Sequence, residues 1–225
     1  MRLLKRKPQS FDLHVQDMVL RVKASPDLFE ESRAAALSFW EQLHAYALQH
    51  PEFSDSLRPI DVPENAPDVI REMVQSAASA GVGPRFTFQG AVLDHVGRYL
   101  ARSAGDVTVS AGGDFFITTK KRMKLTVHRT EDGEPLSVVV DPASGGIGVA
   151  TALVRGAADG VDGLAVLASS CKLAEAAASA VRSILANPGS FKAALEYLGK
   201  VHGVRGGLLV QGDRIGVSGG VEIAA

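Results

Sequence analysis

The chain has 225 residues, a formal net charge of −1 and 46% hydrophobic residues, so it is long enough to bury a substantial core. The near-zero charge provides no global field for DNA or RNA, and we expect no nucleic-acid partner. The one cysteine, Cys171, excludes an internal disulfide and a multi-thiolate zinc site. The N-terminal segment lacks the roughly 7–15 consecutive apolar residues of a secretory signal, and no run approaches the roughly 18 of a membrane span. A cytoplasmic protein without membrane contact is predicted.

Apolar residues at helical spacing predict helices over 25–50, 68–80, 89–103, 171–185 and 191–198. Ser25-Pro26 is typical of a helix start, and Pro51 should stop the first helix because proline disfavours a helical residue before it. The proline-rich stretch 51–67 is predicted to be a surface connection. On the third helix we expect Tyr99 to share the packed face with Val92, Val96 and Leu100.

Alternating or continuous apolar runs predict two strands within 11–23 and further strands at 106–110, 114–119, 124–128, 136–141, 163–168, 206–211 and 214–218. Gln16-Asp17 and Gly212-Asp213 are predicted turns. The successive strands after the third helix indicate an antiparallel meander, whereas 144–163 permits no clear assignment. Helices and antiparallel strands in separate clusters favour an α+β fold. No linker divides the chain, so we predict a single domain over 1–225, with N-terminal strands in 1–23 followed by the long helix 25–50.

The stretch Gly112-Gly113-Asp114 separates two predicted strands. Two glycines and an aspartate are typical of a tight turn or bulge. Glycine also removes side-chain bulk, which lets a flat ring or a phosphate approach the backbone. These three residues alone leave both interpretations open.

A second glycine-rich stretch, from Asp141 to Gly148, includes Ser144, Gly145 and Gly146. Backbone N–H groups in such a loop are able to bind anionic oxygens. The spacing matches neither GxGxxG nor a Walker loop. The alternatives here are an anion-binding loop and an ordinary surface loop.

Glu175 and Ser179 are four residues apart on the predicted helix 171–185, so they project from one face. A carboxylate and a hydroxyl in this arrangement are suitable ligands for Mg²⁺, although a solvated Glu on an alanine-rich helix has the same pattern. Asp94-His95 has the residue types of acid–base catalysis, but it is more typical of the wet face of a helix. The basic run Lys120 to Lys124 is predicted to lie in a hairpin, as a solvated turn or as a phosphate contact.

The order of these short motifs resembles the ApbE flavin transferase family. A helix begins with Gly90-Ala91, a strand leads into Ala111-Gly112-Gly113-Asp114, a Ser-Gly loop follows, and a late strand precedes the helix with Ala174-Glu175. The sequence is still more similar to a prokaryotic family related to ApbE, with its GP…GA…GGD core and the ending GGLLVQGDRIGVSGGVEIA. That resemblance covers roughly residues 51–224.

The ApbE family transfers FMN from FAD to a protein threonine with Mg²⁺, on antiparallel sheets packed against helices. The resemblance therefore implies an ApbE-like fold, a flavin nucleotide ligand (FAD or FMN) and a Mg²⁺ ion. The implied metal ligands are Glu175 and Ser179. The implied cofactor-binding residues are Gly90, Ala91, Gly112, Gly113, Asp114, Ser144, Gly145 and Gly146.

Two departures from the resemblance weaken the case for transfer. Asp94 stands near the position where flavin transferases carry a lysine, and Gly146 and Val149 replace the threonine and histidine of an SSGTVGHS loop. The catalytic residues therefore stay unassigned, and the alternative is a non-catalytic binding or assembly protein that keeps the scaffold. The small residues of helix 171–185 also permit close packing of a second copy, so a homodimer is a further expectation.

Overall fold

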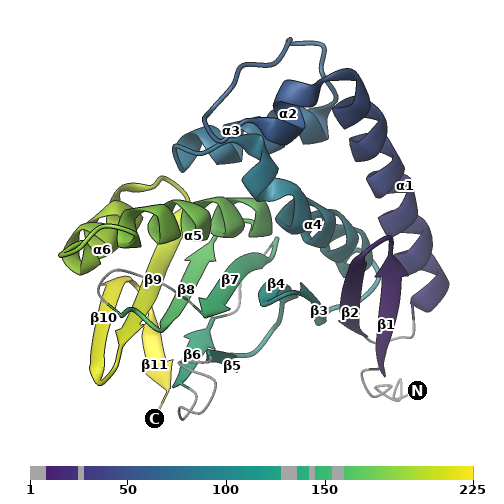
Figure 1. Ribbon diagram of the computed structural model, residues 1–225. Helices are drawn as coiled ribbons and strands as arrows, with labels where there is room; N and C mark the ends of the chain where they lie inside the picture. The colour runs from purple at the N-terminus through teal and green to yellow at the C-terminus, as the bar shows by residue number, and fades with distance from the viewer. Residues whose placement is uncertain (1–8, 25–27, 128–135, 142–144, 154–159, 225) are drawn as a thin grey trace, which may run out of the picture.

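The computed structural model describes residues 9–24, 28–127, 136–141, 145–153 and 160–224. Helices cover one face of a large antiparallel sheet, and a smaller sheet lies against its other face (Figure 1). The large sheet has the order β1-β2-β3-β4-β7-β8-β9-β10. Its strands are β1 (Gln9–Val15), β2 (Met18–Ala24), β3 (Val107–Ala111), β4 (Asp114–Thr118), β7 (Ile147–Leu153), β8 (Gly163–Ala168), β9 (Val204–Gln211) and β10 (Arg214–Gly219). Every neighbouring pair is antiparallel, which confirms the α+β class.

The first two strands form the predicted hairpin. Val15 pairs with Met18 across the turn, and Gln16 has a left-handed φ of 54°. Alternate residues of both strands are buried, including Leu13 and Leu20, because one face of the sheet packs on the core. The Ser25-Pro26 helix start lies outside the described residues.

The helices agree largely with the sequence prediction, with two corrections. They are α1 (Phe29–Gln49), α2 (Pro51–Asp55), α3 (Asp68–Ser79), the 3₁₀ turn η1 (Pro84–Thr87), α4 (Phe88–Ala101), α5 (Cys171–Leu185) and α6 (Phe191–Lys200). The proline-rich stretch contains the short helix α2, since Pro51 is favourable at a helix start, and this helix buries Phe53. Tyr99 is exposed and does not share the packed face of α4. No described helix is both long enough and apolar enough to cross a membrane.

The predicted meander is wrong at its third strand. β3 pairs with β4, but β4 then pairs with β7. Strands β5 (Met123–Val127) and β6 (Leu136–Val140) form a second sheet with β11 (Glu222–Ala224), which sequence patterning did not reveal. The buried faces of the two sheets share one apolar cluster, which includes Leu125, Val138 and Val149. This packing explains the separation, because β5 and β6 bury their apolar residues by covering the sheet rather than extending it.

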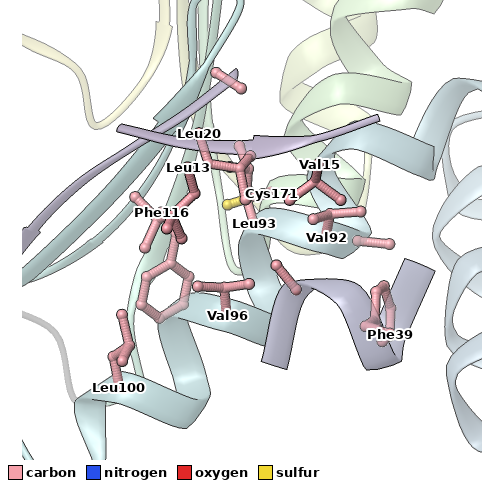
Figure 2. Close-up of a cluster of buried hydrophobic side chains, with 14 of the residues drawn as sticks. Leu13, Val15, Leu20, Phe39, Val92, Leu93, Val96, Leu100, Phe116 and Cys171 are labelled. Carbon is pink, nitrogen blue, oxygen red and sulfur yellow. The ribbon is translucent and has the colours of Figure 1, made fainter. Parts of the chain in front are cut away.

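Helix α4 packs along β4 and so links the two ends of that strand. Figure 2 shows Phe116 of β4 beside Val96 and Leu100 of α4, within the cluster that also holds Cys171. The first turn of α4 meets the start of β4 at Asp114, and its last turn approaches the end of the strand at Thr118. Two separate regions of interest result, one at each end of β4.

Candidate functional site

The first turns of α4 and α5 touch at Gly90. A Cβ atom at this position would lie 2.5 Å from the backbone carbon of Cys171, so any larger residue would force the helices apart. The Gly90 N–H donates a hydrogen bond of 2.7 Å to Oε2 of Glu175. An N–H in the first turn of a helix has no partner within that helix, which makes it available to this carboxylate.

The turn Gly112-Gly113 is tight and is tied to the neighbouring strand. Both glycines have left-handed φ angles, 54° and 98°. The carbonyl oxygen of Gly113 accepts from the backbone N–H of Thr151 at 2.9 Å and from its hydroxyl at 2.7 Å. A Cβ on Gly113 would lie 2.6 Å from the Thr151 carbonyl oxygen. The glycines are thus required by the fold, and their effect on chemistry is to position Asp114.

Asp114 begins β4 and is almost fully buried. Its Oδ2 accepts a hydrogen bond of 2.7 Å from the side-chain amide of Gln89, which also donates to the Ala111 carbonyl at 3.0 Å. Gln89 therefore joins the start of α4 to the turn between β3 and β4. Sequence analysis missed this residue, since a glutamine at a helix start carries no distinctive pattern.

Asp114 and Glu175 are close enough for their charges to interact. Burial, together with the neighbouring Asp114 carboxylate, raises the pKa of Glu175 to about 8 against the hydrogen bond from Gly90. Burial raises the pKa of Asp114 to about 7, against the Gln89 hydrogen bond. The guanidinium of Arg182 lowers both pKa values without cancelling the effect of burial. Carboxyls held in this way favour a cation or a shared proton beside them.

Ser179 lies one turn after Glu175, is buried, and accepts a hydrogen bond of 3.3 Å from Arg182. We call Gln89, Asp114, Glu175, Ser179 and Arg182 the carboxyl cluster. Its two carboxyls and one hydroxyl fit Mg²⁺, which commonly takes one or two protein carboxylates and completes its shell with water and phosphate. No group of three or more His, Cys, Asp or Glu side chains suited to a metal occurs in the described part of the chain.

The family model described as AbpE bacteria matches residues 1–192 of the chain. The chain belongs to this family. Relatives named UPF0280 protein include one from Methanosarcina acetivorans, 25% identical over 227 residues that cover 96% of this chain and 88% of the relative. Another, from Methanocella arvoryzae, is 27% identical over 184 residues, or 79% and 75% of the two chains.

Two solved structures resemble this member of the AbpE bacteria family at low sequence identity. The flavinyl transferase ApbE of Pseudomonas stutzeri in its apo form superposes with a TM-score of 0.64 at 15% identity, covering 99% of this chain and 96% of the other. The ApbE protein of Thermotoga maritima has a TM-score of 0.64 at 12% identity, with coverages of 94% and 97%. These likenesses confirm the ApbE-like fold.

The structure divides the site residues predicted for this AbpE family member into two groups. Gly90, Gly112, Gly113 and Asp114 join Glu175 and Ser179 in or beside the carboxyl cluster, whereas Ala91 is buried in the hydrophobic core. Gly146 lies instead against the Phe116 ring, near Thr118, and Gly145 is its neighbour. Asp114 and Thr118 are four residues apart on β4, which corresponds to about 13 Å. Ser144 lies outside the described residues.

The sequence predicted Asp94 on the solvent-exposed face of its helix, and the structure corrects this prediction. Asp94 is buried, and its carboxylate accepts from the backbone N–H groups of Cys171 at 2.9 Å and Lys172 at 3.2 Å. The Lys172 ammonium adds a contact of 3.3 Å to Asp94 and one of 2.9 Å to Glu72. Asp94 therefore stabilises the start of α5, where a carboxylate is favoured by the helix dipole. The lysine was not identified from sequence, because its partners lie on other helices.

Proposed function

We propose that this protein binds a flavin nucleotide together with Mg²⁺ at the carboxyl cluster. One observation carries the proposal: Asp114 of β4 and Glu175 of α5 approach each other with raised pKa values of about 7 and 8. Such a pair is costly to ionise unless a cation neutralises it. The ApbE-like scaffold supports FAD or FMN as the nucleotide, since ApbE of Pseudomonas stutzeri is a flavinyl transferase.

In this proposal the carboxylates of Asp114 and Glu175 and the hydroxyl of Ser179 would hold the ion. Bound Mg²⁺ would neutralise phosphate charge on the nucleotide. Gln89 orients the Asp114 carboxylate, and the Gly90 N–H fixes Oε2 of Glu175. Arg182 supplies positive charge beside the same group of oxygens.

Transfer of FMN from FAD is the further activity that the family resemblance implies. The position of Asp94 favours a second candidate function, in which the protein binds its ligand or assembles with a partner without transferring flavin. Asp94 stands near the position where a transferase lysine is expected, and its carboxylate is committed to α5 and Lys172. Lys172 in turn is held between Asp94 and Glu72.

Thermal melting with FAD, FMN or NAD, each with and without Mg²⁺, tests the binding proposal. A ligand at a hundred times its dissociation constant stabilises a protein by about 2.7 kcal/mol, which is a readily measured shift. We expect a Mg²⁺-dependent shift with a flavin nucleotide that Glu175→Gln abolishes. Glu196→Gln, on the exposed side of α6, is the matched control and should retain it. No shift with any nucleotide, in a protein that melts cooperatively, would contradict the proposal.

A second assay separates transfer from binding. Transfer breaks the pyrophosphate bond of FAD, moves the FMN phosphoryl group to a hydroxyl oxygen and releases AMP. Chromatography of FAD incubated with the protein, Mg²⁺ and a threonine-containing acceptor would detect that AMP. Binding without AMP release would favour the non-catalytic alternative.

A further inference from the structure

A cavity of about 970 Å³ lies at the far end of β4 from the carboxyl cluster. Residues at the end of α4, the end of β4, the β4–β5 connection and the start of the β7 segment line it, and we call it the distal cavity. Its principal lining residues are Arg98, Arg102, Phe116, Thr118, Lys120 and Gly145. The volume is at the upper end of the range for small-molecule sites, roughly 300–1,000 Å³.

The distal cavity is positively charged by residues from two different elements. Arg102 is at the end of α4, where a cation interacts favourably with the helix dipole. The helix dipole does not explain the position of Lys120 at the cavity, because this residue comes from the β4–β5 connection. The end of the Lys120 side chain lies against Gly105, where a Cβ would be 3.3 Å from its Nζ atom. Lys120 therefore lies against the connection between α4 and β3, where it lines the cavity.

The charges that face these cations are few. Arg98 has the carboxylate of Glu72 at 3.7 Å, and Asp106 accepts the backbone N–H of Lys120 at 2.9 Å. Within the described part of the chain, no carboxylate forms an ion pair with the Arg102 guanidinium or the Lys120 ammonium. Two cations brought together without such a partner favour an anion between them.

The Thr118 hydroxyl is a third polar group at this position. Its oxygen is buried and has no hydrogen-bond partner among the residues that the structure describes. A buried hydroxyl without a partner is costly, by about 1–3 kcal/mol, and such groups are rare in folded proteins. Thr118 lines the distal cavity, so a rotation of its side chain about χ1 would bring the hydroxyl to a ligand oxygen there.

We propose that the distal cavity binds the phosphate group of a small organic phosphate, through Arg102, Lys120 and the Thr118 hydroxyl. Phosphate is the anion that suits this set, because guanidinium and ammonium groups form charge-assisted hydrogen bonds to its oxygens and a hydroxyl adds a neutral one. The cavity has room for the organic part as well. This second site is independent of the carboxyl cluster, which lies at the other end of the strand.

Melting and calorimetric titrations with inorganic phosphate and with AMP, against sodium chloride at equal ionic strength, test the proposal. We expect stabilisation by the phosphates beyond that by chloride. Arg102→Gln and Lys120→Gln should each weaken binding at least about tenfold, since each removes a hydrogen bond to a charged group. Lys121→Gln removes the same charge from the neighbouring residue, which does not line the cavity, and should bind as the wild type does. No response to either probe, or an equal loss in Lys121→Gln, would overturn the proposal.

Two further variants locate the bound phosphate. Thr118→Val removes the buried hydroxyl while keeping the volume of the side chain, so we expect unchanged or higher stability without phosphate and weaker phosphate binding. Glu175→Gln leaves the distal cavity intact and should retain the response. A phosphate response lost in folded Glu175→Gln but retained in Lys120→Gln would place the anion in the carboxyl cluster and overturn the proposal. If no flavin nucleotide stabilises the protein, that result counts against the proposal for the carboxyl cluster and leaves the proposal for the distal cavity unaffected.

Discussion

Gly90 and Glu175 are 85 residues apart in sequence and are joined by a hydrogen bond of 2.7 Å from the backbone N–H of one to the carboxylate of the other. This bond fixes the first turn of α4 against α5. It also sets the position of one of the two carboxyls of the candidate site. The packing of the two helices and the geometry of the site therefore depend on the same contact.

Gly90→Ala should destabilise the protein because its methyl group would meet the backbone of Cys171, which cannot move as a side chain does. Overpacking of this kind costs roughly 1–3 kcal/mol. Urea unfolding measures the loss. Gly199→Ala is the control, because its methyl group would meet only the Ser218 hydroxyl at 3.2 Å and alanine favours the helix. Equal stability of Gly90→Ala and wild type would show that the helices do not approach this closely.

Without divalent cations, the carboxyl cluster should make the folded protein less stable at alkaline pH. The pKa of Glu175 is raised from 4.5 to about 8, so the folded state keeps a proton that the unfolded chain has lost. The stability that protonated Glu175 contributes is thus fully present below about pH 4.5 and is lost progressively as the pH rises to 8. Asp114, with a pKa of about 7, contributes in the same direction.

Glu175→Gln tests this prediction directly, since glutamine retains an oxygen acceptor for the Gly90 N–H but does not ionise. In EDTA, we expect its Tm to match the wild type at pH 4, to exceed it at pH 6 and to exceed it further at pH 9. The exposed Glu196→Gln should follow the wild-type curve throughout. Parallel pH profiles for wild type and Glu175→Gln would mean that the carboxyl is not held in a raised-pKa environment.

Asp94 and Lys172 should be strongly coupled in stability. Both side chains are nearly inaccessible, at 3% and 6% exposure. Removing one member of a buried ion pair leaves an uncompensated charge and costs roughly 3–5 kcal/mol. We expect Asp94→Asn and Lys172→Met to be less destabilising together than the sum of the single changes, as measured by chemical denaturation in a double-mutant cycle.

The exposed pair Lys192 and Glu196 on α6 provides the comparison for that cycle. Pairs at this spacing on a helix surface couple by only about 0.3–0.5 kcal/mol. A coupling between Asp94 and Lys172 no larger than this would contradict the assignment of a buried network.

Local sequence patterns were sufficient for most of the helices and strands. Helix α5 has the predicted bounds, Cys171–Leu185, because its alanine-rich apolar face, the Ser170 cap and the terminating Asn187-Pro188 are all local features. Strand pairing is not local, so the departure of β5 from the large sheet could not be read from alternation.

The candidate site was predictable one residue at a time but not as an arrangement. Glu175 and Asp114 were identified individually, whereas their raised pKa values depend on burial that only the fold creates. Asp94 shows the same limit, because the N–H groups that allow its burial belong to residues 77 and 78 positions further along the chain. A carboxylate on a helix is expected to be solvated unless such distant donors are known.

Arg122 should stabilise the small sheet weakly and in a salt-dependent way. It precedes β5 and pairs with Asp141, which follows β6, at 2.7 Å, and with Glu222 of β11. All three side chains are more than half exposed, and exposed pairs contribute about 0–1 kcal/mol each. Arg122→Gln should therefore lower the free energy of unfolding only slightly at low salt. The difference should shrink in 1 M sodium chloride, where the Debye length is about 3 Å. Lys121→Gln is the control. A larger loss of unfolding free energy in Arg122→Gln that does not depend on salt would indicate that the arginine stabilises the sheet through its apolar stem instead.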